Sequence, residues 1–300
     1  MTKYVCRCMV LWLLFLPVTA QVVREPMTLI SDQRVERAIA GNESHTYQIP
    51  LTAGQFVRFR LEQQAIDTAL IVSAPDGKQL IKMDLTGIGE QETAFLEAAV
   101  TGNYQVYVCS VEATSLRGSY RLDAIAQATA TVLDRQRLLA QGLLLEANAL
   151  AGPQAIEKRQ QALLLLRKTS EPRWEAYTIF SIGLSYANLA QYEKAIEYYE
   201  QSLVIAHEVK DRAGAGYTIG HLGQVYESLS QYEKAIECQE QALTIAREVK
   251  DRRQEGIVLN YLGRSYESLN RYEKAIEYYE QALGSVDISS KPDHRASQID

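Results

Sequence analysis

Two side chains in the C-terminal half have the chemistry of a nucleophile and its base. Cys238 offers a thiol and His221 an imidazole that could accept the thiol proton. Cys238, however, lies forty residues after Tyr198 and forty before Tyr278, in a segment that recurs with that spacing. A cysteine among recurring tyrosines is better explained as a packing substitution. We therefore predict no catalytic residue and no enzyme activity.

Two further sets of side chains could bind metal ions. The other histidines are His45, His207 and His294, whose separations fit no zinc-ligand spacing. Three aspartates lie near one another in the N-terminal half, Asp67, Asp76 and Asp84. They do not form the dense Asp/Asn loop of a calcium site, and turns and strand edges explain them better. We expect no metal and no cofactor.

The elements that would position any site are set by an internal repeat. The segment 191–197 reads QYEKAIE, returns unchanged at 231–237 and returns with one change at 271–277. A degraded copy at 155–163 keeps the same forty-residue phase. Apolar residues within each copy follow the i, i+3, i+4, i+7 spacing of one helix face. The recurrence predicts a stack of helical hairpins.

Small residues recur where the two helices of each hairpin must cross. Gly183, Gly223 and Gly263 fall inside predicted helices, where glycine costs about 1 kcal/mol relative to alanine. Ala195 and its equivalents Ala235 and Ala275 recur on the second helix. We predict close helix crossings at these glycines. Asp211 and Asp251 are expected to cap the next helix, and Ser230 with Glu233 to form a capping box.

These motifs resemble the tetratricopeptide repeat. The shared pattern is Leu-Gly-x-x-Tyr, then Tyr-x-Lys-Ala, then Tyr-x-x-Ala/Ser, and it covers about 134–284. Two departures are an aliphatic residue in place of the usual Trp (Ile179, Ile219 and Leu259) and Gln239 in place of an aromatic residue. The resemblance implies a protein-binding solenoid whose first helices line a concave groove.

The resemblance also assigns candidate partner-binding residues by position. The first clear copy supplies Tyr177, Phe180 and Leu184; the second supplies Tyr217, His221, Gln224 and Glu227; the third supplies Asn260, Tyr261, Arg264 and Glu267. They vary between copies while the core residues repeat. Such variation is expected of a surface read by a partner, and equally of drift on a solvated face. The partner expected is a protein or peptide.

The N-terminus indicates export. Lys3 and Arg7 precede a short apolar run, followed by Pro17 and small residues up to Ala20. This pattern predicts a signal peptide cut after Ala20 and a periplasmic or secreted protein, with no membrane span in the mature chain. Removing two cations and no acid changes the formal charge from −6 to −8. A mildly acidic chain is a poor candidate for nucleic acid.

A unit with strand periodicity precedes the repeats, at about 28–127. We expect seven strands, at 45–51, 55–63, 68–74, 79–85, 93–100, 104–111 and 119–126, and therefore a jelly-roll-like β-sandwich. The motifs at 41–49, 53–56, 74–77 and 101–104 resemble a bacterial pre-peptidase C-terminal domain. The resemblance implies a relation to exported proteins that carry such repeats and a caspase-like CHAT peptidase domain.

The predicted organisation is multidomain, an all-β sandwich followed by an all-α solenoid. Its parts are a signal peptide at 1–20, the sandwich at 28–127, a helical linker with a degenerate first repeat at 128–173, repeats at 174–212, 213–252 and 253–284, and a polar tail at 285–300. The last helix would expose its apolar side, because no capping helix is visible. Either self-association covers it or a longer continuation has been lost.

Two functions follow from the sequence. The first is a non-catalytic exported scaffold that binds a partner segment in the groove. The second is the recognition half of a CHAT-type peptidase whose catalytic domain is missing.

Overall fold

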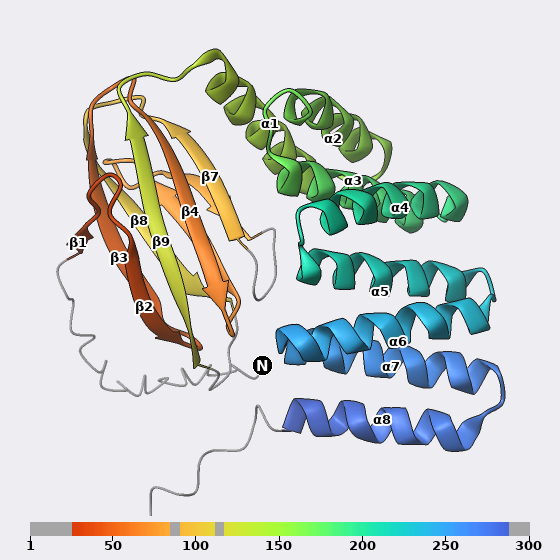
Figure 1. Ribbon diagram of the computed structural model, residues 1–300. Coiled ribbons are helices and arrows are strands. Elements are labelled where there is room, and N and C mark those ends of the chain that lie inside the picture. Colours follow the sequence, from red (N-terminus) through yellow and green to blue (C-terminus); the bar gives the residue numbers. More distant parts are fainter. Residues whose placement is uncertain (1–25, 85–90, 112–116, 288–300) are drawn as a thin grey trace, which may run out of the picture.

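The computed structural model describes residues 26–84, 91–111 and 117–287, with side chains described as far as Ser285. A β-sandwich lies beside a stack of helices, and α1 at the top of Figure 1 leads from one to the other. Within these ranges the chain is therefore an N-terminal sandwich followed by a helical repeat region, as the periodicities predict.

The sandwich has two sheets. The strands are β1 (Met27–Thr28), β2 (Val35–Ala40), β3 (Ser44–Leu51), β4 (Phe56–Gln64), β5 (Thr68–Ser73), β6 (Gln79–Met83), β7 (Gln91–Glu97), β8 (Gly102–Ser110) and β9 (Arg117–Gln127). One sheet has the order β1-β3-β8-β5-β6 and the other β2-β9-β4-β7. All pairs are antiparallel except β1 with β3. In the second sheet β2 and β7 are therefore the two edge strands.

Alternation along β4 contributes one face of the sandwich core. Its residues Val57, Phe59 and Leu61 are fully buried and alternate with partly exposed ones, and Tyr104 of β8 is also fully buried. Strand β2 was absent from the sequence-based prediction. Its burial explains why, because Ile39 alone of its six residues is buried, so its pattern is that of a partly covered edge strand.

Eight helices follow. They are α1 (Val132–Asn148), α2 (Gly152–Leu166), α3 (Pro172–Asn188), α4 (Tyr192–Glu208), α5 (Arg212–Ser228), α6 (Tyr232–Val249), α7 (Arg252–Ser268) and α8 (Tyr272–Asp287). They pack as successive hairpins, α1 with α2, α3 with α4, α5 with α6 and α7 with α8, and each hairpin stacks on the next. The degraded first copy is thus a complete hairpin.

The predicted close crossings are confirmed. A Cβ atom placed on Gly183 would lie 2.8 Å from Cδ1 of Tyr199, and one on Gly263 would overlap the ring of Tyr279. Ala195 is fully buried on the partner helix. A side chain at these glycines would overlap the ring of the facing helix, so the recurring glycine sets the distance between the two helices.

The turns between repeats confirm one capping prediction and correct another. Oδ1 of Asp211 accepts a hydrogen bond from the backbone N–H of Gly214 at 3.0 Å, and Oδ1 of Asp251 accepts one from Gln254 at 2.8 Å. The capping box at Ser230 was wrong. Ser230 ends the preceding helix with φ of 57°, and the N-cap of α6 is Gln231, which makes no side-chain capping bond.

The outer face of α8 is open. Ile276 is 57% exposed and Leu283 is 72% exposed, whereas the equivalent Ile236 and Leu243 of α6 are 8% and 7% exposed beneath the next hairpin. The apolar exposure predicted for the last repeat is present. Whether self-association covers it stays a prediction.

Within the described ranges, every helix is too short or too polar to span a lipid bilayer.

Candidate functional site

The sandwich is joined to the helices through its edge strand. Gln141 of α1 is 5% exposed and lies against β7. Its Nε2 donates to the carbonyl oxygen of Phe95 at 2.8 Å, and its Oε1 accepts from the N–H of Phe95 at 2.8 Å. A buried edge strand leaves backbone groups that need partners. The side chain of Gln141 satisfies two of them and fixes α1 against the sheet.

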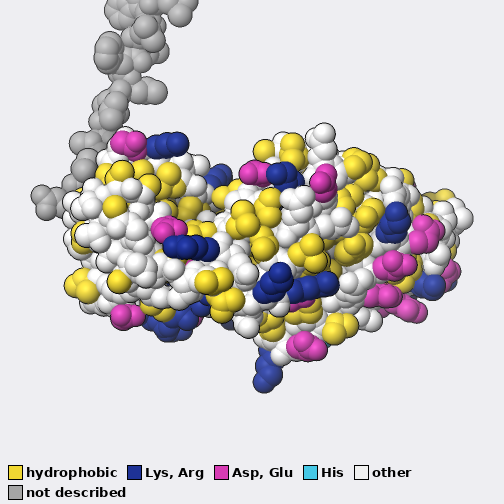
Figure 2. All heavy atoms as spheres, turned by 90° about the horizontal axis from the view of Figure 1, so that it is seen from above, with side chains coloured by type: hydrophobic (Ala, Val, Ile, Leu, Met, Phe, Trp, Pro, Cys, Tyr) yellow, Lys and Arg dark blue, Asp and Glu magenta, His cyan; other side chains and the backbone are white. Residues whose placement is uncertain are grey.

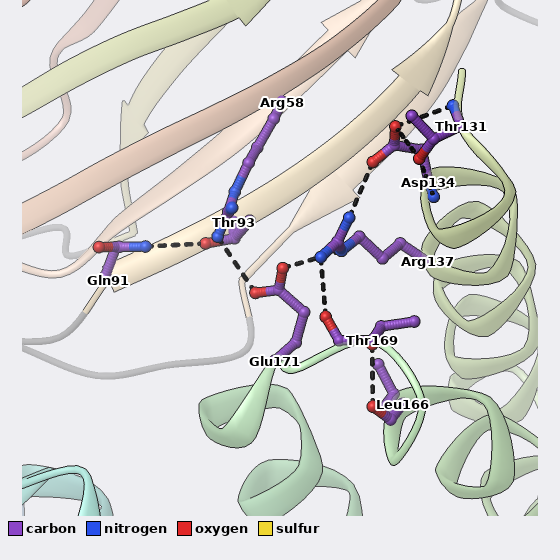
Figure 3. Close-up of polar contacts among 9 residues, drawn as sticks. All are labelled: Arg58, Gln91, Thr93, Thr131, Asp134, Arg137, Leu166, Thr169 and Glu171. Atoms are coloured by element: carbon purple, nitrogen blue, oxygen red, sulfur yellow. Dashed lines mark hydrogen bonds and ion pairs between the residues drawn. The ribbon is translucent and has the colours of Figure 1, made fainter.

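An ion-pair network extends this junction (Figure 3). Glu171, in the connection between α2 and α3, receives Arg58 of β4 at 3.1 Å and Arg137 of α1 at 2.9 Å. Arg137 also pairs with Asp134 at 2.8 Å and donates to the carbonyl oxygen of Thr169 at 2.7 Å. Three segments that are distant in sequence thus meet at one carboxylate. Charge-assisted contacts of this kind hold a specific geometry.

Apolar packing completes the junction. The rings of Phe95 and Trp174 meet edge to face, with 5.4 Å between their centres. Trp174, Leu144 and Leu166 belong to the same buried cluster as the sandwich core. Seen from above, the sandwich and the helices are two lobes in direct contact, with many hydrophobic side chains on the helical lobe (Figure 2). The sandwich therefore has a fixed position beside the repeats.

A cavity of about 390 Å³ lies where the sandwich faces the first helices of the repeats. Its volume is within the range of about 300–1,000 Å³ that is usual for ligand pockets. Five of the predicted partner-binding residues line it: Tyr177, Phe180, Leu184, Tyr217 and His221. They come from the same face of α3 and α5. The cavity joins the start of the concave groove to the sandwich.

The helical wall of the cavity is largely aromatic. His221 contacts the ring of Phe180 edge to face, with 5.1 Å between centres, and the ring of Tyr199 at 6.2 Å. Burial lowers the pKa of His221 to about 4, so the imidazole is neutral at neutral pH. Burial also raises the pKa of Tyr177, which stays a neutral phenol. Among the hydrogen bonds of the described residues, none involves His221.

The sandwich wall is acidic. Asp67 precedes β5, Asp84 follows β6 and Glu92 lies in β7, and all three line the cavity together with Gln91. Sequence reasoning assigned Asp67 and Asp84 to turns and strand edges and did not single out Glu92. Nothing in the local sequence could show that these carboxyl groups face the helices, because the contact depends on the docking of two domains. Asp76 lies in a turn, where it accepts a bond from the N–H of Lys78 at 2.9 Å.

The rim of the cavity carries arginines. Arg173 pairs with Asp211 at 3.2 Å, and Arg253 is exposed. Sequence reasoning named neither, nor Trp174, which also lines the cavity. The hydroxyl of Tyr217 donates to the helix-capping Asp251 at 2.9 Å.

The other six predicted residues are Gln224, Glu227, Asn260, Tyr261, Arg264 and Glu267, and they lie outside the cavity lining. Arg264 pairs with Glu227 at 2.9 Å and its guanidinium lies 5.4 Å from the ring centre of Tyr261. Glu267 accepts a bond from the hydroxyl of Tyr279 at 2.9 Å. Asn260 donates to the carbonyl oxygen of Gly256 in its own helix, at 3.0 Å. Their role in partner binding stays a prediction.

The candidate nucleophile has the properties of a packing residue. Burial raises the pKa of Cys238 to about 11, so the thiol is protonated at neutral pH and is a poor nucleophile. Cys109 and Cys238 are both free thiols. In the described part of the chain, no three His, Cys, Asp or Glu side chains are grouped to hold a metal ion.

The helical hairpins match two protein-family models. Residues 178–213 and 214–285 each match a family model described as tetratricopeptide repeat. Residues 178–285 are tetratricopeptide repeats. The first helices α3, α5 and α7 of these repeats carry the predicted groove residues. The likeness of the sandwich to a pre-peptidase C-terminal domain stays a prediction.

Several solved structures resemble about half of the chain. BtubC (BKLC) from P. vanneervenii is 19% identical, covering 55% of this chain and 70% of its own, with a TM-score of 0.47. Aspartyl phosphate phosphatase F from Bacillus subtilis is 17% identical, covering 54% and 42%, with a TM-score of 0.49. A STAND signal-transduction ATPase from Pyrococcus horikoshii is 24% identical, covering 51% and 24%, with a TM-score of 0.46. No curated protein matches the chain.

Proposed function

We propose that the protein is a non-catalytic protein-binding module that holds a segment of a partner protein in the concave groove of its tetratricopeptide repeats. The observation that carries this proposal is the cavity between the groove and the sandwich. Five groove residues assigned by position from the tetratricopeptide resemblance line that cavity. A partner segment lying along α3, α5 and α7 would therefore begin against the sandwich.

The fixed junction favours binding by a prepared surface. Gln141 and Glu171 hold the sandwich beside α3 through hydrogen bonds and ion pairs. A rigid site loses less conformational entropy when it binds than one that must first be assembled. The sandwich would thus act as one wall of the site, and the repeats as the other.

Site-specific photo-crosslinking in the cells that make the protein tests this proposal. A photoreactive phenylalanine derivative is placed at Leu184, which lines the cavity, and in a second variant at Val204, which is 59% exposed on α4. We expect a discrete adduct from position 184 and none of the same mass from position 204. Adducts of equal yield at both positions, or none at 184, would reject the groove as the binding surface.

We also propose that the protein is exported, on the evidence of residues 1–20, which lie outside the described residues. The intact mass of the endogenous protein tests this proposal. A mass equal to that of Gln21–Asp300 supports export of a freestanding scaffold. A much larger mass favours the second function, recognition within a CHAT-type peptidase, and the full-length unprocessed mass contradicts export.

A further inference from the structure

The cavity beside the groove has one acidic wall and one aromatic wall. We propose that it is the anchor site for a lysine or arginine side chain of the partner segment. This inference rests on the proposed function, since the anchor belongs to a segment bound in the groove.

The charges of the lining favour a cation. Asp67, Asp84 and Glu92 bring three carboxyl groups to the sandwich wall, from the ends of β5, β6 and β7. The lining also holds two arginines, of which Arg173 pairs with Asp211, itself a lining residue, at 3.2 Å. The other, Arg253, is exposed at the rim. The lining as a whole therefore holds four carboxyl groups, those of Asp67, Asp84, Glu92 and Asp211, against two guanidinium groups, and this acidic excess favours a cationic side chain over an anionic one.

The opposite wall suits the same ligand. Phe180, Tyr177 and Tyr217 present aromatic surface from α3 and α5. A cation close to the face of an aromatic ring is attracted by the ring quadrupole, and more strongly where water is displaced. The imidazole of His221 adds no positive charge at neutral pH, because burial lowers its pKa to about 4. This wall therefore does not oppose a cation.

The apolar part of the lining matches the stem of a long basic residue. Leu184, Ala176 and Ala206 line the cavity together with Trp174. Lysine and arginine bury their methylene stems on apolar surface while the charged head reaches a polar group. In this arrangement the stem would lie on α3 and α4 and the head would point to the sandwich. The junction between the domains thus determines which side chain the groove accepts.

Selection of random peptides on the full mature chain tests the anchor. Peptides with blocked ends are selected on the wild-type protein, and their affinity for the Leu184→Asp variant is then measured as a test of groove binding. The best wild-type peptide is then measured against Asp84→Lys and, as a matched control, against Asp76→Lys. Asp84 lines the cavity and is exposed, whereas Asp76 lies in a turn outside the lining, so both variants should fold and both change the net charge equally.

We expect the selected peptides to share one lysine or arginine at a fixed position. Asp84→Lys should weaken binding about tenfold or more, and Asp76→Lys should leave it within about twofold, because a charge-assisted contact is lost only in the first. Replacing the shared basic residue by norleucine should cost a similar factor.

Three results would overturn the anchor. Selected peptides that lose affinity with Leu184→Asp but share no basic residue would leave the groove function intact and reject the cation site. Equal losses of peptide affinity in Asp84→Lys and Asp76→Lys would show that the net charge of the protein, and not a contact in the cavity, causes the effect. Saturable binding of spermidine in the cavity, with no basic residue required in the peptide, would assign the site to a free polyamine. If no peptide depends on Leu184, the proposed function itself fails.

Discussion

Gln141 and Phe95, 46 residues apart, form a two-bond pair in which one side chain takes the place of a neighbouring strand. The amide of Gln141 donates to the carbonyl oxygen of Phe95 and accepts from its N–H, both at 2.8 Å. The edge of the β-sheet thereby ends on a helix instead of in solvent. This pair, with the Glu171 network, gives the sandwich a defined position beside the groove.

Gln141→Leu should destabilise the protein by about 1–3 kcal/mol, because two buried backbone groups of Phe95 lose their partners. Gln161→Leu is the control, since Gln161 is exposed on α2 and should change the free energy of unfolding by less than about 0.5 kcal/mol. Urea unfolding measures both. Equal effects of the two substitutions would show that the junction does not depend on this pair.

The repeat architecture could be predicted because its causes are local and periodic. The forty-residue phase fixes the hairpins, and Gly183 facing Tyr199 confirms why glycine recurs. Ser230 was misassigned because a serine before a helix has the same local sequence signature whether it caps that helix or ends the preceding one. Strand β2 was missed because a partly exposed edge strand lacks full alternation.

The candidate site could be predicted only on its helical side. Tyr177 and His221 lie on the face of the first helices that the tetratricopeptide resemblance implies for the groove. The acidic wall could not be predicted in this way, because Glu92 faces the cavity only when the sandwich is docked on the helices. Contacts such as that of Arg58 with Glu171, which are 113 residues apart in the chain, hold the two together. A single sequence carries no record of such pairs.

A pair of glycine substitutions tests the helix crossing. Gly183→Ala should lower the free energy of unfolding by about 1–3 kcal/mol, because its new methyl group would lie 2.8 Å from the ring of Tyr199. Gly142→Ala in α1 meets no atom within 4 Å and should instead stabilise by about 0.5–1 kcal/mol through helix propensity. Thermal and urea unfolding measure the change in the free energy of unfolding for both variants. A change of the same sign in both would contradict the crossing geometry.

The burial of His221 predicts a specific acid sensitivity. Its pKa is about 4 in the folded protein and near 6.5 when unfolded. Between these values the unfolded chain binds a proton that the folded chain does not, so the free energy of unfolding falls as pH drops from about 6.5 to 4. The loss should be about 1–3 kcal/mol. His221→Phe should lack this part of the slope, and a proton-titration midpoint above 6 for His221 by NMR would refute its burial.

The open face of α8 predicts self-association. Leu283, 72% exposed, should contribute to a contact between copies, because large exposed apolar patches mark interfaces. Sedimentation velocity at increasing concentration should show a dimer for the wild type and a monomer for Leu283→Lys. Val204→Lys, an equally polar change on exposed α4, should leave the dimer intact. A wild-type chain that remains monomeric at all concentrations would contradict self-association through this face.

The fluorescence of Trp174 tests the central claim most directly. The chain has two tryptophans, Trp12 and Trp174, and a protein beginning at Gln21 keeps only the one that lines the cavity. Titration with the partner segment identified by crosslinking at Leu184 should give a saturable change in emission, retained in Val204→Asp and lost in Leu184→Asp. Binding detected by calorimetry, with unchanged Trp174 emission and full affinity in Leu184→Asp, would contradict a binding site in this groove.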